Sequence, residues 1–137
     1  MTGRSATIGK RVGKLAFAAL FVLAGLCHFA STDFFVKIVP PYIPYPRAMV
    51  LVSGVFEIVL GIMLVIPRIS RPAAWGLIAL LIAVFPANVH MSLHAREFSL
   101  PPLLLLLRLP IQGLLILWAW SYARGHGRTP ASRTRSE

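Results

Sequence analysis

The chain has 137 residues, of which 57% are apolar and 13% are charged, and its mean hydropathy is +0.75. A soluble domain carries roughly a quarter charged residues, so this composition excludes an ordinary water-soluble globule. It also excludes a disordered chain, which requires low hydrophobicity. Because the chain has a single cysteine, an internal disulfide and a dithiol redox pair are excluded as well.

Four segments are long and apolar enough to cross a bilayer, which takes about 20 residues. They cover about residues 12–30, 48–66, 73–92 and 102–122. The second and third are separated by a short run that begins with Pro67 and ends with Pro72, which predicts a tight hairpin. We therefore predict one all-α domain over residues 1–122, an antiparallel four-helix transmembrane bundle.

A shorter helical pattern lies between the first and second segments. Phe34, Phe35, Ile38 and Val39 would form one apolar face of a short helix, and the prolines from Pro40 onward would end it. We predict a short interfacial helix on the outer leaflet, followed by a stiff proline loop. A plain extended loop remains the alternative.

The net charge of +10 is explained by topology. Ten of the 14 basic residues lie before or at the start of the first segment, between the second and third, or after the fourth. The positive-inside rule then places both chain termini in the cytoplasm. The basic stretch 123–137 is predicted to be a disordered cytoplasmic tail, and its lack of aromatic residues argues against nucleic acid as a partner.

The first segment has one competing interpretation. Its basic start and the apolar run from Leu15 to Leu26 resemble a secretory signal, and the residues before Cys27 resemble a lipoprotein signal. However, Leu26 stands where such a signal needs a small residue. We therefore expect a retained membrane helix.

Polar residues inside the segments are informative, because an ionised side chain at the bilayer centre costs about 2.5–3.5 kcal/mol. Such residues are His28, Glu57, Asn88, His90, Arg108 and Gln112. At about 1.5 Å per residue, Glu57 and Arg108 lie at similar depths on antiparallel helices. We predict a Glu57–Arg108 contact, with Gln112 one turn below Arg108, and a polar pocket or plug in the outer half of the bundle.

These polar groups have two readings. The charges could bind a ligand, or they could staple the bundle, as interhelical amides such as Asn88 and Gln112 commonly do. An interfacial position would also make His28 inexpensive. His90 and His94 have the spacing of metal ligands but lack a convincing third ligand, so we predict no metal site.

Several short motifs occur in order along residues 15–120. They are Gly25–Phe29, Ile38–Pro44, Ser53–Glu57 with Gly61, Phe85–Asn88 with Met91, and Arg108–Gln112. In these motifs the chain resembles the DoxX-like family of small bacterial membrane proteins. The resemblance implies a four-helix bundle in the inner (cytoplasmic) membrane and implies that His28, Glu57, Asn88, Arg108 and Gln112 are the family's polar positions. It also implies association with membrane oxidoreductases.

The sequence departs from that family in two places. Ser31, Thr32 and Asp33 stand where the family commonly has a proline after its His-Phe pair, and the chain lacks the cysteine pair of thiol-handling relatives. Thiosulfate chemistry therefore does not transfer to this chain.

The sequence favours an accessory or binding subunit that is not catalytic on its own. Its outward-facing polar pocket would hold a quinone or another lipophile, although no cofactor is certain. The expected partners are the lipid bilayer and a membrane oxidoreductase, and a homo-oligomer stays open. The alternatives are a structural or assembly protein with no ligand, and a small-molecule permeation protein.

Overall fold

The computed structural model describes residues 2–124, with side chains from residue 7 onward. The helices are α1 (Thr2–Ala30), α2 (Thr32–Ile38), α3 (Pro46–Val65), α4 (Ser70–Leu93), the 3-10 turn η1 (Ala95–Glu97) and α5 (Pro102–Ala123). The three later spans match the predicted boundaries within a few residues, whereas α1 begins earlier than expected, at Thr2. From residue 125 the predicted disordered tail lies outside the described residues.

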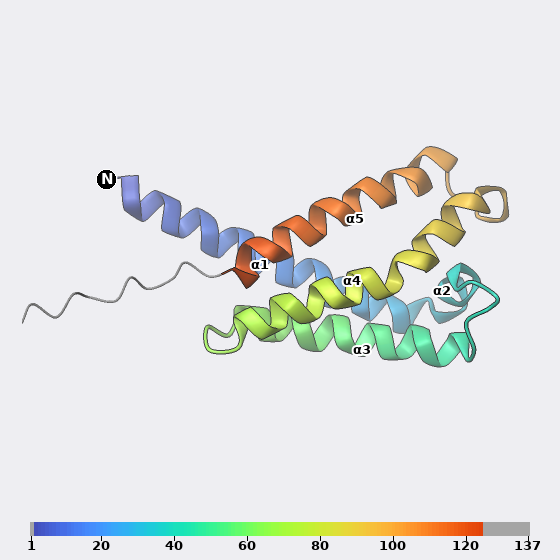
Figure 1. Cartoon of the computed structure of the whole chain (residues 1–137), viewed down its shortest axis with the longest axis horizontal. Coiled ribbons are helices and arrows are strands. Elements are labelled where there is room, and N and C mark those ends of the chain that lie inside the picture. Colours follow the sequence, from blue (N-terminus) through green and yellow to red (C-terminus); the bar gives the residue numbers. More distant parts are fainter. Residues whose placement is uncertain (1, 125–137) are drawn as a thin grey trace, which may run out of the picture.

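The long helices form an antiparallel bundle in which α1 packs on α3, α3 on α4, and α4 on α5. Figure 1 shows them running along the long axis, with α2 and η1 together at one end, which we call the α2 end. The start of α1 and the end of α5 lie toward the opposite end, which we call the terminal end. The predicted all-α fold, with a short helix between the first two spans, is therefore confirmed.

Prolines set several of the helix boundaries. Pro46 and Pro102 occupy the first turns of α3 and α5, where the missing N–H would have no intrahelical partner in any case. The predicted hairpin between α3 and α4 spans only residues 66–69, and the Ile69 amide donates to the Ile66 carbonyl at 3.1 Å. Pro86 and Pro110 lie inside α4 and α5, where each removes one backbone hydrogen bond.

An apolar cluster fills the terminal half of the bundle. It combines residues of all four long helices, with Phe17 of α1, Leu64 of α3 and Leu77 of α4 fully buried at its centre. The Phe17 ring lies 4.7 Å from the Trp118 ring of α5, centroid to centroid. Because large side chains occupy this half, the space for a ligand lies toward the α2 end.

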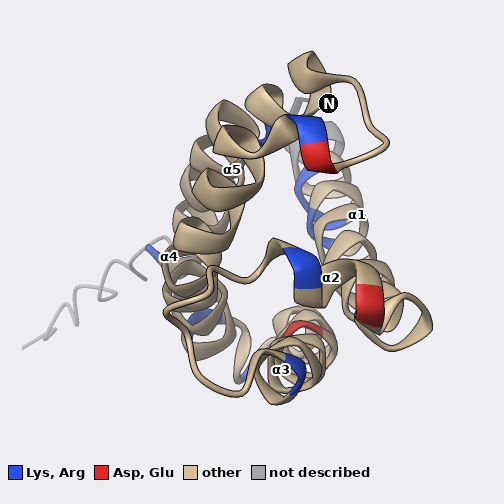
Figure 2. Cartoon of the chain, turned by 90° about the vertical axis from the view of Figure 1, so that its right-hand side faces the viewer, with Lys and Arg blue, Asp and Glu red and all other residues tan. Residues whose placement is uncertain are grey.

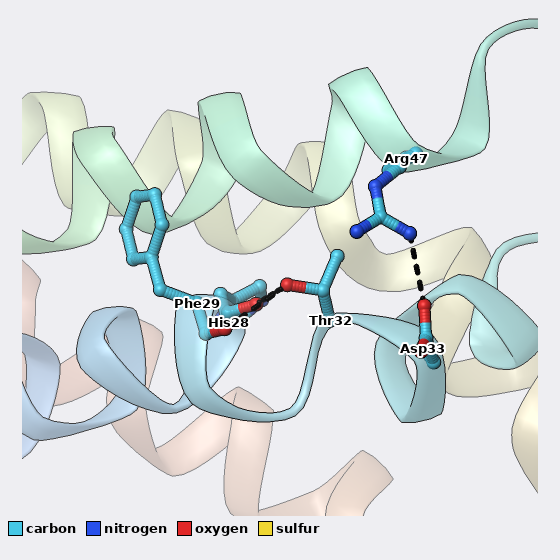
Figure 3. Close-up of polar contacts among 5 residues, drawn as sticks. All are labelled: His28, Phe29, Thr32, Asp33 and Arg47. Atoms are coloured by element: carbon cyan, nitrogen blue, oxygen red, sulfur yellow. Dashed lines mark hydrogen bonds and ion pairs between the residues drawn. The ribbon is translucent and has the colours of Figure 1, made fainter.

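Helix α2 folds back over the other end of the bundle. Thr32 Oγ1 donates to the carbonyl of His28 at 2.8 Å, and an exposed Arg47–Asp33 ion pair at 2.9 Å ties α2 to α3, as Figure 3 shows. Figure 2 looks onto this end and shows α2 lying among the four long helices. Ile38 is buried there against Met91 of α4, so the apolar face of α2 covers protein.

Glycines bring α1 and α3 into close backbone contact. A Cβ atom added at Gly25 would lie 2.6 Å from the Gly54 carbonyl oxygen, and one added at Gly54 would lie 2.8 Å from the His28 Cβ. One at Gly61 would lie 3.0 Å from the Ala18 carbonyl oxygen. Small residues at such spacing let membrane helices approach closely. This seam therefore fixes how α1 faces α3.

The outer surface of the bundle is apolar. Large hydrophobic side chains are exposed on all four long helices, including Leu23, Ile62, Ile82 and Leu114. The four helices are each long and apolar enough to cross a membrane. Acyl chains would cover these side chains, so the chain is a multi-pass membrane protein.

The glycine seam can be tested by adding a single methyl group. We expect Gly25→Ala to destabilise the bundle by about 1–3 kcal/mol, because the added carbon overlaps the α3 backbone. Gly113→Ala is the matched control within α5, since a Cβ there meets nothing within 4 Å and Ala favours a helix by up to about 1 kcal/mol. Reversible unfolding in mixed micelles measures both, and equal stabilities would contradict the seam.

Candidate functional site

A cavity of about 690 Å³ lies between the helices in the half of the bundle nearer the α2 end. This size falls within the range of about 300–1,000 Å³ that is typical of small-molecule sites. Most of its lining is apolar. The polar side chains that line it are His28, Ser53, Glu57, Asn88, Arg108 and Gln112, so the structure brings all five predicted site residues to one cavity.

Glu57 is the acidic group of the cavity and is almost fully buried. Its side chain is 10% exposed, and its Oε2 atom lies 3.5 Å from the Nδ1 atom of His28. The same Nδ1 lies 2.9 Å from the Ala24 carbonyl oxygen, which can only accept, so Nδ1 carries the proton and donates it there. Within residues 2–124, Glu57 Oε2 therefore has no hydrogen-bond partner.

Arg108 supplies the positive charge from the opposite wall. Its Nη1 atom donates to the Met91 sulfur at 3.6 Å, and a thioether is a weak acceptor. No carboxylate of the described residues lies within 4 Å of this guanidinium. A guanidinium has five N–H donors, so Arg108 retains donors for a group inside the cavity.

The predicted Glu57–Arg108 contact is wrong. Glu57 of α3 meets His28 of α1, and α4 stands between α3 and α5. The depth argument used the rise along each helix, which says nothing about which helices are neighbours around the bundle. The Gly25–Gly54 seam decided that arrangement, because it turns the His28 face of α1 toward α3.

Asn88 and Gln112 are the polar residues of the site that have hydrogen-bond partners in each other. Asn88 Nδ2 donates to Gln112 Oε1 at 2.9 Å, and Gln112 Nε2 donates to the Leu81 carbonyl. Ser92, one turn after Asn88, also donates to the Leu105 carbonyl of α5 at 3.0 Å. These bonds join α4 to α5, and they agree with the structural reading of the two amides.

Ser53 is a cavity residue that the sequence analysis used only as part of a motif. Its Oγ is buried without a hydrogen-bond partner among the described residues, and it lies one helical turn from Glu57. The spacing of four residues was the available signal, since positions i and i+4 share a helix face. The α3 wall thus presents a hydroxyl and a carboxylate side by side.

The histidines toward the end of α4 lie outside this cavity lining. The rings of His90 and His94 are 4.2 Å apart, and His94 Nδ1 donates to the His90 carbonyl at 2.9 Å. Among the described residues, no three His, Cys, Asp or Glu side chains converge as metal ligands would.

The two walls of the cavity thus carry different polar groups. The α3 wall carries acceptors and a hydroxyl without partners, and the α5 wall carries a cation with spare donors. Buried polar groups without partners are costly in a medium of low dielectric. A ligand head with both an acceptor and a donor would satisfy both walls, and apolar side chains would surround the rest of it.

The amide pair predicts a measurable coupling. Gln112→Leu and Asn88→Leu should each destabilise the bundle, since each leaves the other amide without its partner. The double variant should lose less than the sum of the two, by about 1 kcal/mol, which is the scale of interhelical hydrogen bonds in membranes. Unfolding in mixed micelles provides the four stabilities, and strict additivity would show that the bond contributes nothing.

Comparison with known proteins identifies a family and no activity. No curated protein and no solved structure matches this chain significantly. One family model, described as a domain of unknown function (DUF8561), matches residues 17–123. The matched range runs from within α1 to the end of α5 and contains all six polar residues of the cavity. The chain therefore belongs to the DUF8561 family.

Proposed function

We propose that this protein binds a small lipophile with a polar head in the cavity between its helices, as an accessory subunit of a membrane oxidoreductase. The observation that supports this most is that two buried groups of the cavity, Ser53 Oγ and Glu57 Oε2, have no hydrogen-bond partner among the described residues. Arg108 lines the same cavity, and the hydrogen bond of its side chain goes to a thioether. Polar groups whose only role is to hold the helices together would be expected to form hydrogen bonds with each other.

A quinone head suits the two walls in both of its redox states. An oxidised quinone offers carbonyl oxygens, which would accept hydrogen bonds from Arg108. A reduced quinol offers hydroxyl groups, which would donate to Glu57 Oε2. The apolar lining suits the ring and tail, and the resemblance to DoxX-like proteins points to the same chemistry. Cys27 lines the cavity, but the chain has no second cysteine with which it could form a dithiol redox pair, which favours a binding role.

Two alternatives make different claims about the same residues. A permeation protein would need a polar path through the terminal half, where the described side chains instead form the apolar cluster around Phe17, Leu64 and Leu77. A purely structural protein is favoured by the Asn88–Gln112 bond, which holds α4 to α5. If the protein is purely structural, Arg108 should contribute to the stability of the bundle, as Gln112 does.

Arg108→Gln should separate binding from stability. We expect affinity for decyl-benzoquinone in nanodiscs to fall by about tenfold or more, because a hydrogen bond to a charged group contributes about 1.5–3 kcal/mol. Arg96→Gln is the control, because Arg96 is exposed and lies outside the cavity lining. If wild-type protein does not bind the probe, or if Arg108→Gln costs stability without changing binding, the structural reading is favoured.

We further propose that the terminal end of the bundle faces the cytoplasm of a bacterial cell, with the protein in the inner membrane. Figure 1 shows the turn between α3 and α4 and the end of α5 at this end. Arg68 lies in this turn, Arg71 lies in the first turn of α4, and Arg124 directly follows α5. Lys14 Nζ donates to Ser70 Oγ at 2.7 Å, and Arg71 Nε donates to the Ala123 carbonyl at 3.2 Å. Basic residues are retained on the cytoplasmic side of membrane proteins.

Reporter fusions test this orientation. A reporter at either chain terminus should be active in the cytoplasm, and one inserted within residues 41–45 should be active only on the outer side. Termini that report from opposite sides of the membrane would contradict the even number of spans.

A further inference from the structure

The α2 end of the cavity is covered by protein. Phe35 and Ile38 of α2 line the cavity together with Val39, which directly follows the helix, and the Phe35 ring stacks on the His28 ring with centroids 4.0 Å apart. Ile38 is 4% exposed and packs in a second apolar cluster with Met91, Phe98 and Leu105. A molecule arriving from water at this end would meet α2 first, whereas the sequence analysis expected the pocket to face outward.

The side between α1 and α5 is built differently. Close to the terminal end these helices meet through rings, since Phe17 lies 4.7 Å from Trp118 and 6.0 Å from Tyr122. Lys14 also lies over the Tyr122 ring, at 5.4 Å. All the ring contacts described between α1 and α5 belong to this region. They close the side between the two helices near the terminal end, and other side chains form this side nearer the α2 end.

Beyond these ring contacts, α1 and α5 each present a stripe of residues to the cavity. The α1 stripe is Leu20, Ala24 and Cys27, and the α5 stripe is Arg108, Ile111 and Leu115. Residues at such spacings share one helix face. Leu20 is 45% exposed and Ile111 is 49% exposed, although both line the cavity. Val52 and Phe56 of α3 also line the cavity and are as exposed, but α3 packs closely on both of its neighbours, α1 and α4, whereas the backbones of α1 and α5 do not pack closely on each other. The cavity wall therefore reaches the surface of the bundle here, at a depth where acyl chains surround it.

We infer that the ligand enters and leaves sideways from the bilayer, between α1 and α5, and that it is an amphiphile whose apolar tail stays in that opening. This rests on the proposed function for the identity of the cavity as a binding site. The polar head reaches Ser53, Glu57 and Arg108, and the tail lies against Leu20 and Ile111. A water-soluble solute has no such route, because α2 and its apolar cluster stand between it and the polar groups.

Obstruction of the opening tests the route. Ile111→Trp places a bulky side chain in it, and Leu114→Trp is the matched control, because Leu114 is 64% exposed on the same helix and does not line the cavity. With tritiated decyl-benzoquinone in nanodiscs, Ile111→Trp should slow both association and dissociation by about tenfold, as obstruction of a gating step does. Leu114→Trp should leave both rates within about twofold of wild type. Equal rates in the two variants would overturn the inference.

A second measurement needs no ligand. Alkyl diazirines dissolved in the bilayer add on illumination to carboxylic acids, and Glu57 is the only acidic residue within the four spans. A diazirine-bearing fatty alcohol in nanodiscs should label Glu57, as peptide mass spectrometry would show. Ile111→Trp should suppress this labelling, whereas Leu114→Trp should not.

The outcomes separate the route from the function. If Glu57 is labelled from the bilayer but decyl-benzoquinone does not bind, the lateral opening stands and the proposed function fails for this class of ligand. If the probe binds but Glu57 is labelled only by a water-soluble diazirine, the ligand passes α2 and the lateral route is overturned. Labelling from the bilayer that Ile111→Trp does not change would also overturn it.

Discussion

The close approach of α1 and α3 at Gly25 and Gly54 is the constraint on which the rest of the structure depends. With no room for a Cβ on either side, the two backbones pack against each other and His28 comes to lie over Glu57. Membrane helices gain little from hydrophobic association, so backbone packing of this kind carries much of the specificity. Because α1 is held on α3, it meets α5 through the aromatic residues near the terminal end, and the cavity occupies the space beyond them.

The polar residues of the cavity divide into two groups with different physical roles. Asn88 and Gln112 satisfy each other and the Leu81 carbonyl, and they hold α4 to α5. Ser53, Glu57 and Arg108 keep unpaired donors or acceptors, although the surrounding side chains are apolar. A half-satisfied network is less favourable than an apolar core, so a chain that only needed a stable bundle would gain from replacing these three residues. Their combination with a cavity of ligand size argues for a molecule that completes the network.

Helix α2 limits the sides from which the cavity can be reached. Its Ile38 is buried in one apolar cluster with Met91 of α4 and Leu105 of α5, and its Phe35 stacks on His28, so one short element both covers the α2 end and orients a cavity residue. The cavity then lies at a depth where hydrocarbon surrounds the bundle, and this decides what kind of molecule can reach the polar groups. In the proposed route, a lipophile dissolved in the bilayer would meet the opening beside Leu20 and Ile111 and would not have to leave the hydrocarbon phase to bind.

The sequence by itself determined the four spans, the short helix after the first of them, and five of the six polar residues at the cavity. Apolar runs of membrane length and prolines at helix starts are local properties, and an intramembrane charge stands out wherever its helix packs. Only the tertiary structure decided that Glu57 faces His28 instead of Arg108, that Ser53 belongs to the cavity, and that α2 closes one end. Position along a helix gives depth in the membrane, whereas the rotation and neighbours of each helix follow from contacts such as Gly25 on Gly54, which join residues far apart in the chain.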